Sequence, residues 1–333
     1  MDLSIVWAGI LVLAVFIYVV LDGFDLGIGM LFAAFPHKRD RDLLMNTVAP
    51  VWDGNETWLI LGGGGLFAAF PMAYGILMTA FYAPVIAMLL ALVFRGVAFE
   101  YRWRSRRYER WWDRAFILGS LVASLAQGII LGALLQGVNV DGRAYGGGWW
   151  DWLTPFSLLN GVAVAIAYVL LGACWLVLKT EGAVQARARR IGIVGCCLTV
   201  LMIGLVSLTT PFLEAAYYRR WFSFPTVVLL SPVPLAVAFT SLLLYRALRG
   251  AGSDLRPFLL TLVLFALCFV GLGVSLWPYI IPTEVTIWEA AAPPSSQLFM
   301  LVGALILLPI ILGYTGFAYW VFRGKQDPEK GYH

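Results

Sequence analysis

The chain has 333 residues, of which 61% are hydrophobic and only 13% are charged, and its mean hydropathy is +0.84. Soluble domains carry about 25% charged residues, so this composition excludes a soluble fold and predicts one integral membrane domain over residues 1–333. The formal net charge is +4, and the placement of the basic residues along the chain is more informative than this total.

Nine apolar stretches of roughly 20 residues predict an all-α protein with nine transmembrane helices. Their approximate limits are 4–35, 54–71, 74–97, 114–138, 155–179, 190–210, 225–247, 258–280 and 296–322. No Lys or Arg precedes Lys38, so the first stretch is expected to be a retained helix rather than a cleaved signal. The second contains four consecutive glycines at 62–65, which favour close approach between helices.

The basic residues test this count of helices. All but three of the 23 Lys and Arg residues fall on the side that is reached after odd-numbered helices, and the exceptions are Arg143, Arg219 and Arg220. Basic residues accumulate on the cytoplasmic side of membrane proteins. We therefore expect a periplasmic N-terminus and a cytoplasmic C-terminus, whereas a count of eight helices would break the pattern.

Histidines and cysteines indicate that this chain binds no cofactor or metal by itself. Buried haem iron usually needs a His ligand, but the two histidines, His37 and His333, lie in polar segments expected in the cytoplasm. The four cysteines lie within apolar runs without C-x-x-C spacing, as packing residues do. The sequence also lacks a phosphate-binding G-x-x-x-x-G-K-[ST] motif.

Carboxylates within the first two helices are the best candidates for chemistry. Asp22 and Asp25 share one face of the first helix, being three residues apart. Charge inside a membrane is costly and is usually retained for function. The pair is therefore interpreted either as protonatable groups on a polar path or as ordinary carboxylates hydrogen-bonded at a helix end.

A second polar group, Trp52, Asp53 and Glu56, precedes the second helix on the cytoplasmic side. Asp53 could cap that helix, which alone would explain its presence. The alternative is a proton pathway in which Asp53, with Trp52 and Glu56, leads toward Asp22 and Asp25.

Four further residues are expected to have structural roles or to lie at a subunit interface. Arg95 and Glu100 lie at the cytoplasmic end of the third helix, where a structural ion pair is expected. Trp288 and Gln297 lie near the outer start of the last helix.

Several segments together resemble subunit II of the cytochrome bd-type quinol oxidases. They are DGFDLG at 22–27, APVWDGN at 49–55, LFAAFP at 66–71, FR at 94–95, LLQG at 134–137 and the segment from Trp288 to Gln297. They occur in order across nearly the whole chain. The segment PPSS at 293–296 is similar to the cyanide-insensitive branch.

The resemblance implies two four-helix bundles plus one extra helix, in a multi-pass protein of the bacterial cytoplasmic (inner) membrane. It implies oxidation of quinol coupled to reduction of O2 to water, with b- and d-type or only b-type haems in a partner, subunit I. This chain would support subunit I and contribute to proton or O2 access. A structural quinone or lipid and a small single-helix accessory subunit are further expectations from the resemblance.

Two other functions remain open. A purely structural scaffold subunit would explain the missing cofactor but not the buried carboxylates. A secondary transporter would explain those carboxylates, but such proteins usually contain paired broken helices in two repeats, and no matched pair is evident here.

The predicted orientation can be tested by labelling single cysteines in whole cells. An impermeant thiol reagent should leave Ser105→Cys unmodified, because the arginine-rich loop lies inside, and should modify Thr154→Cys. Labelling of Ser105→Cys from outside would overturn the assigned orientation.

Overall fold

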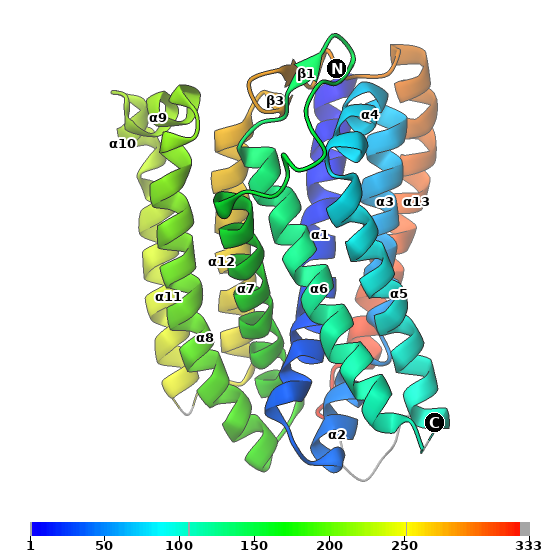
Figure 1. The fold of residues 1–333 in the computed structure, drawn as a ribbon. Coiled ribbons are helices and arrows are strands. Elements are labelled where there is room, and N and C mark those ends of the chain that lie inside the picture. Colours follow the sequence, from blue (N-terminus) through cyan, green and yellow to red (C-terminus); the bar gives the residue numbers. More distant parts are fainter. Residues whose placement is uncertain (1, 106, 251, 327–333) are drawn as a thin grey trace.

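The computed structural model describes residues 2–105, 107–250 and 252–326, and this part of the chain is an elongated helical bundle (Figure 1). Arg106, Lys330 and His333, which entered the sequence arguments, lie outside the described residues. The helices are α1 (Leu3–Leu31), α2 (Lys38–Val48), α3 (Trp52–Ala69), α4 (Pro71–Ala80), α5 (Tyr82–Arg104), α6 (Glu109–Leu135), α7 (Pro155–Lys179), α8 (Gly182–Thr209), α9 (Ala215–Phe222), α10 (Thr226–Leu230), α11 (Pro232–Arg249), α12 (Leu255–Leu276) and α13 (Pro294–Val321).

Two short antiparallel hairpins connect helices at the end of the bundle where α1 begins (Figure 1). They are β1 (Val140–Asp141) with β2 (Ala144–Tyr145), and β3 (Tyr279–Ile281) with β4 (Val285–Thr286). Neither these hairpins nor the amphipathic helices α2 and α9 were predicted from the sequence.

Eight helical segments in the described part of the chain are long and apolar enough to cross a membrane. They are Leu3–Ala34, Tyr82–Arg104, Glu109–Leu135, Pro155–Lys179, Gly182–Phe212, Thr226–Arg249, Leu255–Leu276 and Pro294–Val321. A multi-pass membrane protein is therefore confirmed. The second predicted span corresponds to α3, which is helical but polar in its first half.

Two of the predicted helices are interrupted, and proline explains both breaks. The stretch predicted as one helix over 74–97 contains α4 and α5, which meet at Phe81, and the stretch over 225–247 contains α10 and α11, which meet at Ser231. A proline ring clashes with the carbonyl group four residues earlier in a helix. Pro84 and Pro234 stand four residues after the last residues of α4 and α10, so each helix ends there.

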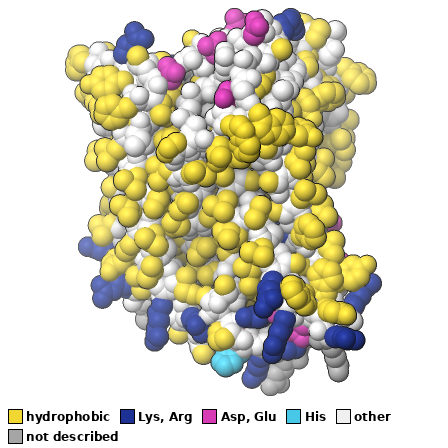
Figure 2. Space-filling view, in the orientation of Figure 1, with side chains coloured by type: hydrophobic (Ala, Val, Ile, Leu, Met, Phe, Trp, Pro, Cys, Tyr) yellow, Lys and Arg dark blue, Asp and Glu magenta, His cyan; other side chains and the backbone are white. Residues whose placement is uncertain are grey.

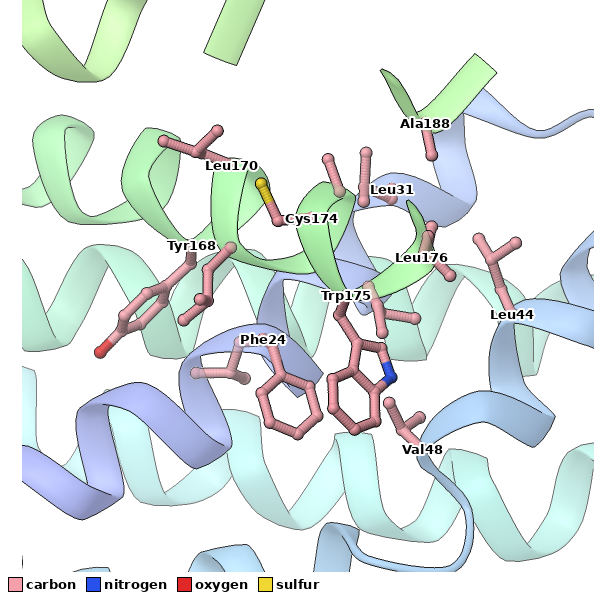
Figure 3. Packing of buried hydrophobic residues seen from close by; sticks show 14 of the residues in the cluster. Phe24, Leu31, Leu44, Val48, Tyr168, Leu170, Cys174, Trp175, Leu176 and Ala188 are labelled. Atoms are coloured by element: carbon pink, nitrogen blue, oxygen red, sulfur yellow. The ribbon is translucent and has the colours of Figure 1, made fainter. Parts of the chain in front are cut away.

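Helix α1 lies between two groups of helices. It contacts α3, α6 and α7, while α7, α8, α11 and α12 pack against one another on one side. Helix α13 lies at the periphery against α1 and α3. The hydrophobic core runs along α1 and α7, where Phe24 stacks on Trp175 at a centroid distance of 4.3 Å (Figure 3).

Glycines bring α1 and α7 into backbone contact. A Cβ atom on Gly27 would lie 1.9 Å from the backbone oxygen of Tyr168, and a Cβ atom on Gly172 would lie 2.8 Å from the backbone of Gly27. Small residues play this part in membranes, where helices associate by close packing rather than by hydrophobic exclusion. The segment that carries Asp22 and Asp25 is therefore fixed against its neighbour.

A buried ion network joins α2, α5 and α6 at the opposite end of the bundle. The fully buried Arg102 side chain contacts Asp42 at 2.7 Å and Asp113 at 2.6 Å, and Asp113 also accepts from Arg41 at 2.8 Å. Because Arg102 has several carboxylate partners, its burial is compensated, and the network holds the short helix α2 under the bundle.

Helix α13 is held largely through its two ends. At its start, the buried Gln297 donates to the carbonyl of Ala292, whose own N–H donates to Ala69 at the end of α3. After its end, Lys325 contacts Asp254 at 2.6 Å. Burial alone would raise the pKa of Asp254, but hydrogen bonds from Lys325 and Gln185 outweigh burial and hold this pKa below its ordinary value.

Substitution Gly27→Ala should disrupt the contact between α1 and α7, because the new methyl group meets backbone that cannot move aside. We expect a loss of about 1–3 kcal/mol in stability and reduced accumulation in the membrane. Thermal unfolding of the purified protein would measure it. Gly204→Ala is the matched control, since nothing lies within 4 Å of its Cβ position. Equal stability of the two variants would contradict this account of the packing.

Candidate functional site

The centre of the candidate site is the guanidinium group of Arg95, whose side chain has 0% exposure. Its Nη1 atom contacts Asp22 Oδ1 at 2.7 Å and Glu56 Oε1 at 2.9 Å, and its Nη2 atom lies 3.7 Å from Asp25 Oδ2. These residues come from α1, α3 and α5. We call them the Arg95 cluster.

Close packing explains why Arg95 is buried. Gly119 on α6 presses against α5, since a Cβ atom there would lie 2.7 Å from the Ala91 oxygen and 3.2 Å from the Arg95 nitrogen. Helix α6 therefore closes one side of Arg95 without a side chain of its own at that point. The guanidinium group is left facing the carboxylates of α1 and α3.

The Arg95 cluster has more negative groups than positive ones. Three carboxylates surround one guanidinium group, so full ionisation would leave two excess negative charges in a largely buried site. Such an excess is costly in a low-dielectric interior, and protonation of a carboxylate relieves it. Four of its buried polar atoms also lack a hydrogen-bond partner among the described residues, namely Asp22 Oδ2, Asp25 Oδ1, Arg95 Nε and Arg95 Nη2.

A hydrogen-bonded branch connects the Arg95 cluster to the last helix. The Asn55 side-chain amide donates to Asp25 Oδ2 at 2.7 Å, and the Tyr319 hydroxyl on α13 donates to Asn55 Oδ1 at 2.8 Å. Neither Asn55 nor Tyr319 was predicted as a site residue. The position of Asn55 beside Asp53 and Glu56 was the only signal in the sequence.

A second branch runs from α1 to α6 and α7. The Tyr168 hydroxyl donates to Gln127 Oε1 at 2.6 Å, and Gln127 Nε2 donates to the Tyr18 hydroxyl at 2.8 Å. Tyr18 stands four residues before Asp22 and so lies on the same face of α1. Sequence reasoning missed this branch, although Gln127 is conspicuous as a polar residue within an apolar helix.

The structure places Asp53 and Trp52 beside the Arg95 cluster rather than in it. Asp53 is exposed at the second position of α3, one turn before Glu56. The N-cap residue is Val51, so Asp53 is not the cap, although its charge suits the positive end of the helix. Trp52 stacks on Phe99 at 5.0 Å, and no hydrogen bond joins it to Asp53 within the described part of the chain.

The four residues that were predicted to have structural or interface roles lie in different parts of the structure. Arg95 pairs with other helices, while Glu100 faces solvent and lies 3.7 Å from Arg104. Trp288 donates to Asp2 Oδ2 at 2.7 Å at the end of the bundle where α1 begins, and this bond holds the pKa of Asp2 below its ordinary value. Gln297 accepts a hydrogen bond at its backbone oxygen from Trp7 at 3.1 Å.

Residues 2–105, 107–250 and 252–326 contain no group of three or more His, Cys, Asp or Glu side chains suited to a metal ion. His37 is exposed and precedes α2, outside the apolar spans. The carboxylates and tyrosine hydroxyl groups of the Arg95 cluster and its two branches can bind and release protons.

Substitution Arg95→Gln should be strongly destabilising, because it leaves three carboxylates without their cation. The expected loss is about 3–5 kcal/mol, seen as poor accumulation in the membrane and early thermal unfolding. Combining it with Asp22→Asn should restore part of the loss, since both members of a pair are then neutral. Arg104→Gln is the control, with a side chain that is 75% exposed. Wild-type stability of Arg95→Gln would refute the importance of this ion pair.

Comparison with known proteins agrees across nearly the whole chain. The family model described as cytochrome bd terminal oxidase subunit II matches residues 3–322. Cytochrome bd-I ubiquinol oxidase subunit 2 of Escherichia coli (strain K12) is 31% identical over 358 residues, covering 95% of this chain and 94% of the relative. Cytochrome bd ubiquinol oxidase subunit 2 of Bacillus subtilis (strain 168) is 30% identical, covering 95% of each chain. A chain of the bd oxidase from Geobacillus thermodenitrificans shares the fold with a TM-score of 0.78, at 18% identity, over 97% of this chain and 99% of that chain.

Proposed function

This chain belongs to the cytochrome bd terminal oxidase subunit II family, and we propose that it conducts protons from the cytoplasm toward the haems of a partner subunit. Membership makes it a subunit of a membrane quinol oxidase, so the secondary-transporter alternative falls away. The resemblance predicted from its motifs is confirmed. The route of the protons, the location of the haems and the faces of the complex are the proposed parts.

The haems of the complex, b- and d-type or b-type alone, are proposed to lie in subunit I. The support is chemical: His37 is exposed outside the apolar spans, and haem iron most often needs a His ligand within its pocket.

Nine crossings with a periplasmic N-terminus are supported by the geometry of α3. Its 18 residues span about 27 Å, close to the roughly 30 Å hydrocarbon thickness of a bilayer. Its polar half is compensated by Arg95, so low hydropathy does not prevent it from crossing.

The start of α1 and the end of α13 lie at opposite ends of the bundle (Figure 1), and Lys and Arg gather at the end where α13 finishes (Figure 2). With α3 as a span, α13, α3, α5 and α6 form one bundle of four, α7, α8, α11 and α12 form the other, and α1 lies between them.

The outer face of α3 is the proposed contact with subunit I. Exposed residues recur along it at three- or four-residue spacing, and they are Asp53, Thr57, Ile60, Gly64 and Phe67. A Cβ atom on Gly63 or Gly64 would have no neighbour within 4 Å, so a second helix could approach closely there. A carboxylate and a hydroxyl group on this face are also better accommodated against protein than against lipid.

The observation that carries the proton route is the position of Glu56. Its side chain is 26% exposed and touches the fully buried Arg95, which in turn contacts Asp22 and lies near Asp25. Glu56 therefore connects the exposed Asp53, one turn earlier on α3, to the buried pair on α1. Bound water would satisfy the unpartnered polar atoms of the Arg95 cluster and complete such a path.

Asp53→Asn tests the route. The complex should assemble with its full haem spectrum, but quinol-driven O2 consumption should fall about tenfold, equivalent to roughly 1.4 kcal/mol in the barrier. Glu181→Gln is the matched control, a cytoplasmic carboxylate that is 75% exposed and distant from the Arg95 cluster in sequence. Under a purely structural role for this subunit, the assembled Asp53→Asn complex would turn over normally, and that result would rule out Asp53 as the start of the path.

A further inference from the structure

The two hydrogen bonds of the second branch run in one direction, from Tyr168 through Gln127 to Tyr18. Tyr168 gives its proton to Gln127 Oε1, and the Gln127 amide gives its own to the oxygen of Tyr18. The Tyr18 hydroxyl proton is therefore not used within the branch. Tyr18 and Tyr168 are buried and Gln127 is half-buried between α1, α6 and α7, so the Tyr18 proton needs another acceptor nearby.

Asp22 is the acceptor that the geometry offers. It follows Tyr18 by one turn on the same face of α1, and both side chains are buried there. Its Oδ1 atom is held by Arg95 at 2.7 Å, while Oδ2 has no hydrogen-bond partner in the described part of the chain. A hydrogen bond from the Tyr18 hydroxyl to Oδ2 would give Asp22 a donor on each oxygen, and donors of this kind favour the ionised carboxylate.

Asp25 is held less firmly as an anion. Arg95 Nη2 lies 3.7 Å away, beyond ordinary hydrogen-bonding distance, and the Asn55 amide is the neutral donor to Oδ2. Asp25 Oδ1 has no partner among the described residues. The third carboxylate, Glu56, is partly exposed and contacts Arg95 Nη1 at 2.9 Å, closer than Asp25 lies to Nη2. Tyr319 reaches the site through Asn55 and brings no positive charge.

We propose that Tyr18 is a positioning residue, which keeps Asp22 ionised as the permanent partner of Arg95 and thereby leaves the exchangeable proton of the Arg95 cluster on Asp25. The hydrogen bonds from Tyr168 to Gln127 and from Gln127 to Tyr18 orient the Tyr18 hydroxyl group. This inference deepens the proposed proton route by assigning different roles to two carboxylates one turn apart: Asp22 is a fixed counter-ion and Asp25 is the proton carrier.

Infrared spectroscopy of the purified complex tests the assignment. A protonated carboxylic acid has a carbonyl stretching band that is distinct from carboxylate bands and sensitive to deuterium exchange. Relative to the wild type, Asp25→Asn should lack one such band, whereas Asp22→Asn and Glu56→Gln should retain it. Loss of the band in either of the latter, or no loss in Asp25→Asn, overturns the proposal. If Asp22→Asn does not assemble, the comparison of Asp25→Asn with Glu56→Gln still decides.

The part played by Tyr18 has its own test. In Tyr18→Phe, Asp22 loses the donor to Oδ2 and should share the proton, so the double variant Tyr18→Phe with Asp25→Asn should regain a protonated-carboxyl band. Tyr245→Phe on α11 makes the same chemical change outside the Arg95 cluster and should leave the spectrum of Asp25→Asn unchanged. A double variant that remains without the band shows that Tyr18 does not position Asp22.

Measuring O2 consumption by the same variants distinguishes failure of this inference from failure of the proposed function. Loss of the band in Asp25→Asn together with normal O2 consumption would support the proton assignment and refute the proton route. Loss of the band in Asp22→Asn would refute the assignment, whatever happens to turnover.

Discussion

The structure depends on a guanidinium group that stays charged although its side chain is fully buried. Arg95 is fully buried, so its charge must be balanced by side chains delivered from other helices. Asp22 and Asp25 on α1 and Glu56 on α3 meet that requirement, which fixes the rotation and the height of three helices relative to one another. The polar first half of α3 is explained by this arrangement, because it faces Arg95.

The segment at 22–29 combines charge and close packing. Asp22 and Asp25 face Arg95, while Gly27 on the same helix lies against the backbone of α7 and Gly29 lies against Ser120 of α6. The glycines allow α6 and α7 to exclude water and lipid from the carboxylates. The cost of burying these charges and the specificity of the packing are therefore coupled in one stretch of helix.

The class of protein and the eight long apolar helices could be predicted from the sequence, because length and hydropathy are local properties. It was also sufficient for the shared face of Asp22 and Asp25, which follows from their spacing. The partners of Arg95 could not be deduced, since Asp22 lies 73 residues away and the order of helices around the bundle is not written in any local pattern. For the same reason the sequence did not reveal that Tyr319 and Tyr168 belong to the site. Pro84 and Pro234, by contrast, are local features from which the two helix breaks could have been predicted.

Under the proposed topology, in which α3 crosses the membrane, this helix also constrains how the protein is made. Its first turns contain Asp53, Asn55 and Glu56, and on insertion scales each charged residue opposes entry into the bilayer by a few kcal/mol. On its own α3 is therefore a weaker membrane segment than α1 and α5, which have the length and hydropathy of membrane spans. Pairing of Glu56 with Arg95 then offsets the cost. Assembly of this subunit in the membrane is therefore cooperative, with α3 retained only after both of its neighbours are in place.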